Sequence, residues 1–392
     1  MTYRNTIAAG AMTVLAAAPQ AFANPAEIKA IETLWQNPQD AGALTAESFA
    51  RAVPDDELTA IINRLRDETG AALSVTGDQG VYTIHTETHE IPVQIALDEN
   101  GRITGLFFSP PEALTEGPAA TLNAFEAMPG KISYLVLSED ETLFAKEADS
   151  ALAVASAFKL GVLKVLLDDI ASGTRDWQDI AILQPEDKSL PTGRLQDFPD
   201  GSPLTLHTLA TLMIAESDNT ATDMLMRILG PGRVADALGL ESVLTTRAMF
   251  ALKADPALAA QYAAAASPRD KAAIADRATS RPLPAIAAVT GPATDGVEWH
   301  LSNAKLCALM RAVADADVFS VNPGPVRTRA WQSVAYKGGS ETGVLNLTAA
   351  LTGKDGRKVC VSLTINDKTA IDETTAVGLF TRLAHQLAES GK

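Results

Sequence analysis

The sequence predicts an α+β protein of two domains, and three observations lead to this fold class. Its 392 residues exceed the roughly 150 that one domain commonly holds. Hydrophobic residues make up 46% of the chain and charged residues 20%, which is enough apolar content for sizeable cores. The third observation is the order of the predicted elements. Helices precede strands in residues 24–108, whereas in residues 119–392 strands near both ends enclose a mostly helical stretch.

Residues 1–23 have the pattern of a secretory signal peptide. Arg4 precedes a short apolar run, and Ala21-Phe22-Ala23 supplies the small residues of a cleavage site. The run is shorter than the roughly 20 apolar residues that a membrane span needs. We therefore expect an exported protein, periplasmic or secreted, whose mature chain begins near Asn24 and has no membrane span.

The small α+β domain is predicted over residues 24–108. One helix is indicated by apolar residues that recur at helical spacing behind an acidic first turn and before Gly70: Leu58, Ile61, Ile62 and Leu65. Strands are expected at residues 80–85, 91–97 and 102–108. Residues 109–118 are the predicted linker, because Pro110 and Pro111 cannot continue the interior of a strand.

The large domain is predicted over residues 119–392. Its expected elements are a helix at 119–127, strands at 132–137 and 142–145, mostly helical sequence at 151–313, strands at 333–337, 344–351 and 359–366, and a helix at 373–389. The first and last strands must then share one sheet, and a cleft should lie between the edge of this sheet and the helical part.

Charge and cysteine content exclude several classes of protein. The net charge of -16 makes binding to nucleic acid or to anionic membranes unfavourable. Two cysteines, Cys307 in a helical pattern and Cys360 in a strand-like one, either pair or stay as buried thiols. His85 and His89 have the spacing of a zinc pair but lie in strand-like sequence. We expect no metal and no cofactor.

Two serine-lysine pairs occur at helix starts. Ser156 and Lys159 lie on one helical face, so the amine can reach the hydroxyl. A desolvated lysine can remove the proton that makes a serine hydroxyl a poor nucleophile. Ser302 and Lys305 have the same spacing, but we interpret Ser302 as an ordinary N-cap residue.

Two further segments complete a set. Ser217-Asp218-Asn219 precedes an apolar helical run and by itself indicates an N-cap. Lys337-Gly338-Gly339-Ser340 lies at the end of a predicted strand, where two glycines indicate the close approach of a backbone or a ligand. The three segments occur in the order serine-x-x-lysine, serine-aspartate-asparagine and lysine-glycine-glycine.

Together they resemble the motif set of class A β-lactamases and penicillin-binding proteins, which has threonine where this chain has Gly338. The resemblance spans about residues 114–392 and implies a β-lactamase/transpeptidase-like domain, with an antiparallel sheet and a helical subdomain. Residues 49–58, 101–106 and 245–253 are similar to the two-domain β-lactamase-like proteins of clavulanic-acid gene clusters. That similarity implies a small domain with the fold of nuclear transport factor 2 and steroid isomerase.

The resemblance implies a role for each motif residue. Ser156 would be the nucleophile, Lys159 its general base and Ser217 the carrier of the proton to the leaving group. Lys337 would attract a substrate carboxylate and help keep Lys159 neutral. The remaining implied roles are substrate binding by Asn219, Gly339 and Ser340, and an oxyanion hole formed by the backbone amides of Ser156 and Ser340.

The chain departs from the family at the group that activates water for deacylation. Glu241 imitates the family's glutamate pattern but lies too soon after Ser217, and alignment places Ala251-Leu252 at that position. Glu298 and Asp295 are possible substitutes. The final strands also lack an obvious arginine facing the carboxylate site.

We therefore expect an exported serine hydrolase that opens β-lactams or related amides and esters through an acyl-serine. Its partner is a small-molecule substrate: a β-lactam, an ester or a peptidoglycan-like peptide. Two alternatives stay open. One is a D-alanyl peptidase or esterase of penicillin-binding type, and the other is a binding module that is acylated once, or that holds a ligand in its small domain, without turnover.

Overall fold

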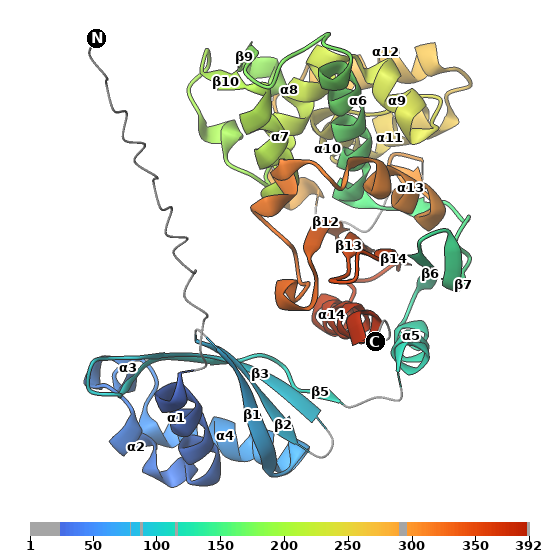
Figure 1. Ribbon diagram of the computed structural model, residues 1–392. Coiled ribbons are helices and arrows are strands. Elements are labelled where there is room, and N and C mark those ends of the chain that lie inside the picture. Colours follow the sequence, from blue (N-terminus) through green and yellow to red (C-terminus); the bar gives the residue numbers. More distant parts are fainter. Residues whose placement is uncertain (1–23, 79, 87–88, 114–116, 290–295, 390–392) are drawn as a thin grey trace, which may run out of the picture. The chain divides into compact units, whose positions relative to one another are not determined.

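The computed structural model describes residues 24–78, 80–86, 89–113, 117–289 and 296–389. The chain divides into two compact units, Met1–Thr115 and Glu116–Lys392, each with its own sheet and helices (Figure 1). The predicted signal peptide lies outside the described residues. Along the described part of the chain, no helix is long and apolar enough to cross a bilayer.

In the small unit, helices pack on an antiparallel sheet. Its strands are β1 (Ala72–Asp78), β2 (Val81–Thr86), β3 (His89–Leu97) and β4 (Ile103–Phe108), hydrogen-bonded in that order, with β5 (Glu112–Ala113) beside β3. Its helices are α1 (Pro25–Gln36), α2 (Ala41–Leu44), α3 (Glu47–Ala50) and α4 (Asp55–Thr69). Apolar side chains of α1, α4 and the sheet form one core, which includes Ile31, Trp35, Ile62, Ile84 and Ile91.

The helix predicted before Gly70 is α4, and Gly70 ends it with a φ of 89°. Two strands of this unit are absent from the sequence prediction. Strand β1 contains Gly77 and alternates weakly, so it has little local strand signal. Strand β5 lies inside the predicted linker. Its residues Glu112 and Ala113 directly follow Pro110 and Pro111 and pair with β3.

The large unit is built on one antiparallel sheet in the order β12-β13-β14-β6-β7. These strands are β6 (Lys131–Ser138), β7 (Glu141–Lys146), β12 (Ser333–Glu341), β13 (Val344–Thr352) and β14 (Lys358–Asn366). The first and last strands of the unit therefore share one sheet, as predicted. Strand β12 is longer than expected: Gly338 and Gly339 lie within it and pair with β13 rather than following its end.

Helices cover both faces of this sheet. Helices α5 (Pro118–Glu126) and α14 (Glu373–Glu389) pack on one face, where Phe125 and Phe380 join the core. Helix α13 (Asn303–Val313) contacts β14, β13 and β6 on the opposite face.

The segment between β7 and β12 is mostly helical, as predicted. Besides α13 and further short 3₁₀ turns, it contains the 3₁₀ turn η2 (Ala155–Phe158), α6 (Lys159–Ala171), α7 (Leu206–Ala215), α8 (Asn219–Leu229), α9 (Pro231–Leu238), α10 (Thr246–Lys253), α11 (Pro256–Ala264) and α12 (Pro268–Thr279). Two short antiparallel pairs join β8 (Leu152–Ala153) to β11 (His300–Leu301) and β9 (Ile180–Ile182) to β10 (Pro203–Thr205).

The two cysteines form a disulfide between α13 and β14. The Cα atoms of Cys307 and Cys360 are 5.9 Å apart, which lies within the usual range for a disulfide. Leu135 of β6 packs beside the bond in the same small apolar cluster. Pairing is therefore the correct one of the two alternatives that the sequence leaves open.

We expect reduction of this disulfide to lower the free energy of unfolding of the large unit by up to about 4 kcal/mol. The two cysteines are 53 residues apart, and the chain-entropy account gives about 4 kcal/mol for a loop of that length. The measurement is urea unfolding with and without a thiol reductant. A variant with both cysteines replaced by alanine should unfold at the same urea concentration with and without the reductant. Equal midpoints for the oxidised and reduced natural chain would contradict the prediction.

Candidate active site

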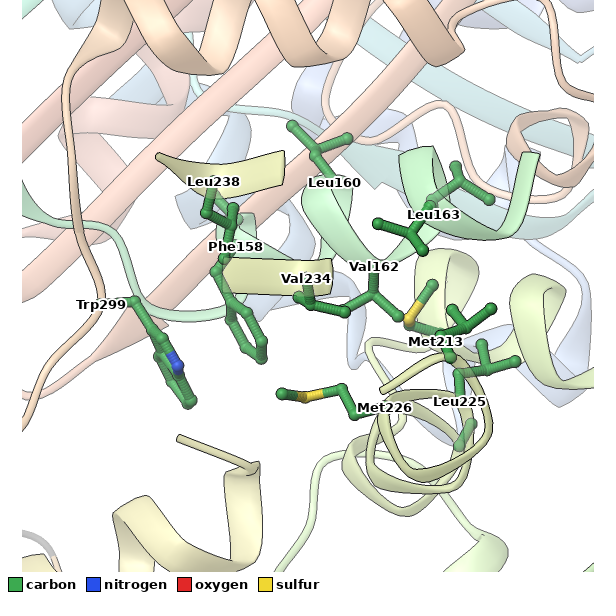
Figure 2. Close-up of a cluster of buried hydrophobic side chains, with 14 of the residues drawn as sticks. Phe158, Leu160, Val162, Leu163, Met213, Leu225, Met226, Val234, Leu238 and Trp299 are labelled. Carbon is green, nitrogen blue, oxygen red and sulfur yellow. The ribbon is translucent and has the colours of Figure 1, made fainter. Parts of the chain in front are cut away.

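Ser156 lies just before a helix that is anchored in the apolar core. It belongs to the turn η2, which leads into α6 at Lys159. Phe158, between them, stacks on Trp299 with ring centroids 3.9 Å apart (Figure 2). Further along α6, apolar side chains pack among those of α7, α8 and α9 (Figure 2). These contacts fix the start of α6 and with it the Ser156 backbone.

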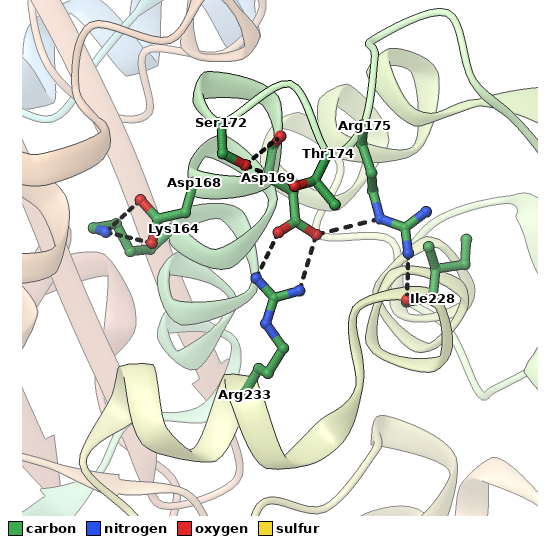
Figure 3. Close-up of polar contacts among 8 residues, drawn as sticks. All are labelled: Lys164, Asp168, Asp169, Ser172, Thr174, Arg175, Ile228 and Arg233. Atoms are coloured by element: carbon green, nitrogen blue, oxygen red, sulfur yellow. Dashed lines mark hydrogen bonds and ion pairs between the residues drawn. The ribbon is translucent and has the colours of Figure 1, made fainter.

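A buried carboxylate anchors the other end of α6. Asp169 accepts hydrogen bonds from Arg233 of α9 at 2.5 and 2.9 Å and from Arg175 at 3.3 Å (Figure 3). Arg175 also donates to the carbonyl oxygen of Ile228 in α8 at 2.8 Å. The hydrogen bonds from Arg233 hold the pKa of Asp169 below its ordinary value. A helix fixed at both ends can present a nucleophile in one orientation.

The Lys159 side chain is fully buried, and its amine contacts the serine-aspartate-asparagine segment. Its Nζ lies 2.6 Å from the Ser217 carbonyl oxygen, 3.1 Å from Ser217 Oγ and 2.7 Å from Asn219 Oδ1. Asn219 in turn donates from Nδ2 to the Leu190 carbonyl oxygen at 3.0 Å. Both polar atoms of the Asn219 amide are thus engaged, and in the free protein Asn219 positions Lys159.

Neighbouring residues of this segment do different things. Asp218 caps α8, accepting from the Ala221 amide at 2.8 Å, and its second oxygen accepts from the amides of Arg194 and Leu195 at 2.7 and 2.9 Å. The N-cap interpretation is therefore right for Asp218. Ser217 has a φ of 54°, which is uncommon for a residue with a side chain. Such strained positions cluster at functional sites.

Lys337 approaches the same hydroxyl from β12. Its Nζ donates to Ser217 Oγ at 3.1 Å and to the Gly338 carbonyl oxygen at 2.5 Å. Ser217 Oγ therefore lies within hydrogen-bonding distance of two amines, Lys159 from α6 and Lys337 from the sheet. The three segments that the sequence singled out meet at this one atom.

The surroundings favour a neutral Lys159. Burial lowers the pKa of Lys159 well below its ordinary value, the charge of Lys337 lowers it further, and Asp223 and Asp218 act in the opposite direction. Burial lowers the pKa of Lys337 to about 7. Repulsion from Lys337 therefore lowers the pKa of Lys159 less than burial does. A neutral Lys159 has a lone pair that can accept a hydroxyl proton.

Ser156 opens onto a cavity of about 540 Å³ between the edge strand β12 and the helical part. Its walls hold most of the predicted site residues: Ser156, Ser217, Asn219, Lys337, Gly339 and Ser340. Neither the hydroxyl nor the amide of Ser156 is hydrogen-bonded to another described residue, so both can meet a ligand. A Cβ on Gly339 would lie 2.6 Å from the Ser156 amide nitrogen. Strand β12 therefore runs directly beside η2.

The candidates for water activation lie elsewhere. Ala251-Leu252, where alignment places the family's glutamate, does not line the cavity, and α10 instead presents Met249 and Phe250 to it. Glu241 is exposed, and Glu298 is enclosed and paired with Lys253, so neither lies on the cavity wall. The other substitute, Asp295, lies outside the described residues.

Sequence reasoning missed a buried ion cluster at the cavity edge. Lys253 Nζ lies 2.6 Å from Glu298 Oε1 and 2.5 Å from Glu341 Oε2, and Glu341 lines the cavity. Burial, and next the neighbouring Glu298, raise the pKa of Glu341 to about 8. The two acidic residues are 45 and 88 positions away from the lysine. No local pattern could have linked them.

We expect the preference for carboxylate-bearing substrates to fall as the pH rises through about 7. Lys337 is charged below its folded pKa of about 7 and neutral above it, so its attraction for a carboxylate is lost in that direction. The measurement is the ratio of kcat/KM for an acid to that for its methyl ester, on both sides of pH 7. Protonation of Lys159 affects both substrates and cancels in this ratio. Lys337→Ala should flatten the profile, and a natural chain with a constant ratio would refute this role.

Comparisons with known proteins bear on the large unit. Residues 118–390 match the family described as Beta-lactamase enzyme family. A solved β-lactamase from Sphaerobacter thermophilus is 22% identical, covering 69% of this chain and 96% of that one, with a TM-score of 0.49. A mutant of PBP-A, solved as an acyl-enzyme complex with penicillin G, is 14% identical, covering 71% and 97%, with a TM-score of 0.50. No curated protein sequence matches the chain.

The fold and the family match define a serine hydrolase related to β-lactamases. The matched residues make up well over half of the chain, so the protein belongs to the β-lactamase enzyme family. At 14% identity, the likeness to PBP-A bears on the fold alone, which is the β-lactamase/transpeptidase-like combination of sheet and helices that the sequence predicts.

Proposed function

We propose that this serine hydrolase opens β-lactams, or related amides and esters, through an acyl-enzyme on Ser156. The observation that carries the proposal is the meeting of Lys159 and Lys337 at Ser217 Oγ, beside a cavity onto which Ser156 opens. The substrate would be a small molecule whose carbonyl carbon reaches the Ser156 hydroxyl.

The residues suggest a complete acylation sequence. Ser156 Oγ attacks the carbonyl carbon, and its proton passes to the neutral Lys159. The carbonyl oxygen becomes negative and accepts hydrogen bonds from the amides of Ser156 and Ser340. The proton then moves from Lys159 through Ser217 Oγ to the leaving nitrogen or oxygen as the bond to carbon breaks. Water later hydrolyses the ester on Ser156 to release an acid.

The α10 wall favours esters as a second class of substrate. Met249 and Phe250 supply an apolar surface and no carboxylate that could activate water. Deacylation then depends on Lys159 and Ser217, as we propose for an esterase or D-alanyl peptidase of penicillin-binding type. For this reason we expect acyl-enzymes formed from β-lactams to turn over slowly.

We propose that the protein is exported to the periplasm or secreted. The pattern of residues 1–23 supports this, as does the Cys307–Cys360 disulfide, since disulfides persist in oxidising compartments. For the small unit we propose the fold of nuclear transport factor 2 and steroid isomerase, supported by its helices on one antiparallel sheet. This would group the chain with the β-lactamase-like proteins of clavulanic-acid gene clusters.

The test incubates the protein with a chromogenic cephalosporin, a small acyl ester and a D-alanyl-D-alanine peptide in separate reactions, following product release and intact mass. Sustained release from the cephalosporin or the ester supports the hydrolase, and release of D-alanine identifies the peptidase. A single mass gain without further release identifies a protein that is acylated once. The absence of both release and mass gain with every substrate would overturn the proposal.

A further inference from the structure

The side chain of Tyr336 occupies the space that a side chain at position 338 would need. The two residues lie on the same face of β12, because strand residues two apart point the same way. A Cβ on Gly338 would collide with Tyr336 Oη and lie 3.0 Å from its Cζ. A Cβ on Gly324, whose φ is 64°, would collide with the ring of the same tyrosine. Two glycines therefore make room for a phenol whose hydroxyl lies beside the backbone of residue 338.

The Tyr336 hydroxyl is a donor with no acceptor among the described residues. The residue lines the cavity, and within the described part of the chain its hydroxyl has no hydrogen-bond partner and is not enclosed. Phe380 of α14 holds the ring edge-on, with centroids 6.2 Å apart. Burial raises the pKa of Tyr336 above its ordinary value, so the phenol stays protonated. A fixed O–H group of this kind suits a ligand that brings the acceptor.

The neighbouring charges indicate the chemistry of that acceptor. Strand β12 is the edge of the sheet, so side chains from both of its faces reach the cavity. Lys337 has three donors and uses two of them within the protein. Glu373 of α14 is exposed, so water screens its charge. The other carboxylates of the cavity wall are in ion pairs, Glu216 with Arg194 and Glu341 with Lys253.

Building on the proposed function, we propose that Tyr336 Oη donates a hydrogen bond to the carboxylate of the substrate. It thereby supplies the hydroxyl that the family's motif has as a threonine and that Gly338 lacks. Lys337 contributes the charge and Tyr336 the directed hydrogen bond. A threonine at position 338 and a tyrosine at position 336 collide in this arrangement, so one hydroxyl replaces the other. Tyr336 is therefore a residue that determines specificity for carboxylate-bearing substrates.

The test compares a cephalosporin with its own methyl ester, so that only the carboxylate differs. Tyr336→Phe removes the hydroxyl and keeps the ring. We expect the second-order rate constant of acylation, followed by intact mass, to fall about tenfold for the acid, as for the loss of a hydrogen bond to a charged group. The rate constant for the methyl ester should stay the same. Equal losses for both substrates, or no loss for either, would overturn the assignment.

A double variant tests whether a hydroxyl at position 338 can replace the one at position 336. Tyr336→Ala alone should reduce the preference for the acid about tenfold, with Lys337 keeping the remainder, and Tyr336→Ala combined with Gly338→Thr should regain it. Failure to regain the preference counts against the proposal. If the natural chain is acylated by neither substrate, the proposed function itself fails. If it is acylated by both and no variant changes the preference, only the role of Tyr336 is refuted.

Discussion

Replacing Ser156 with alanine should abolish acylation, with a loss of about 10⁴-fold or more in rate, as for other serine nucleophiles. Ser156 supplies the hydroxyl beside its own free amide at the cavity wall, whereas Ser217 Oγ is held between two amines. The measurement is the intact mass after incubation with a β-lactam. The natural chain should gain the mass of the acyl group and the variant should not.

Ser302→Ala is the matched control, because Ser302 and Lys305 repeat the serine-x-x-lysine spacing. In the structure Ser302 caps α13, and its Oγ accepts from the Lys305 amide at 3.1 Å. Loss of this cap should cost about 1 kcal/mol of stability and leave acylation intact. The reverse result, in which Ser156→Ala is still acylated and Ser302→Ala is not, would show that Ser156 is not the nucleophile.

The parts of the fold that the sequence predicts are those with a strong local pattern. Alternating or continuous apolar runs predict the strands of the large sheet, and the helix at Glu373–Glu389 has the predicted bounds. Strand β1 lacks such a pattern and is missed. The N-cap at Ser302 is also predicted from the sequence, because an N-cap hydrogen bond joins residues only three positions apart.

The parts that the sequence does not predict depend on distant residues meeting in space. The order of three motifs predicts one crevice, but not that Asn219 turns its amide toward Lys159 and the Leu190 carbonyl. Gly338 indicates a close approach without indicating that Tyr336 fills the space. Helix and strand patterns around Cys307 and Cys360 say nothing of the distance between them. These features follow from packing, which a local pattern does not encode.

Removing the Lys253 ammonium should lower the free energy of unfolding by about 3–5 kcal/mol, the usual cost of leaving a buried charge without its partner. The side chains of Lys253 and Glu298 are 2% and 0% exposed and that of Glu341 is 17% exposed, so water cannot replace the cation. Lys253→Met keeps the apolar stem and removes only the charge. The measurement is urea unfolding near pH 8.

Lys164→Met provides the matched control on the same unit. Lys164 Nζ lies 2.7 Å from Asp168 Oδ2 (Figure 3), a separation similar to those around Lys253, but the two side chains are 33% and 58% exposed. Exposed pairs of this kind are worth about 0–1 kcal/mol. Equal losses in the two variants would mean that burial does not set the strength of the Lys253 cluster.

The pH dependence separates lost charge from lost packing. The pKa of Glu341 is 4.5 in the unfolded chain and about 8 in the folded one. Between these pH values the folded state binds one proton more than the unfolded state, so the free energy of unfolding falls as the pH rises. Without Lys253 the ionised carboxylates lose their cation, and this fall should steepen. The cost of Lys253→Met should therefore shrink toward about pH 5, where the Glu341 carboxyl is protonated. A cost that stays constant between these pH values would assign the effect to the packing of the lysine stem.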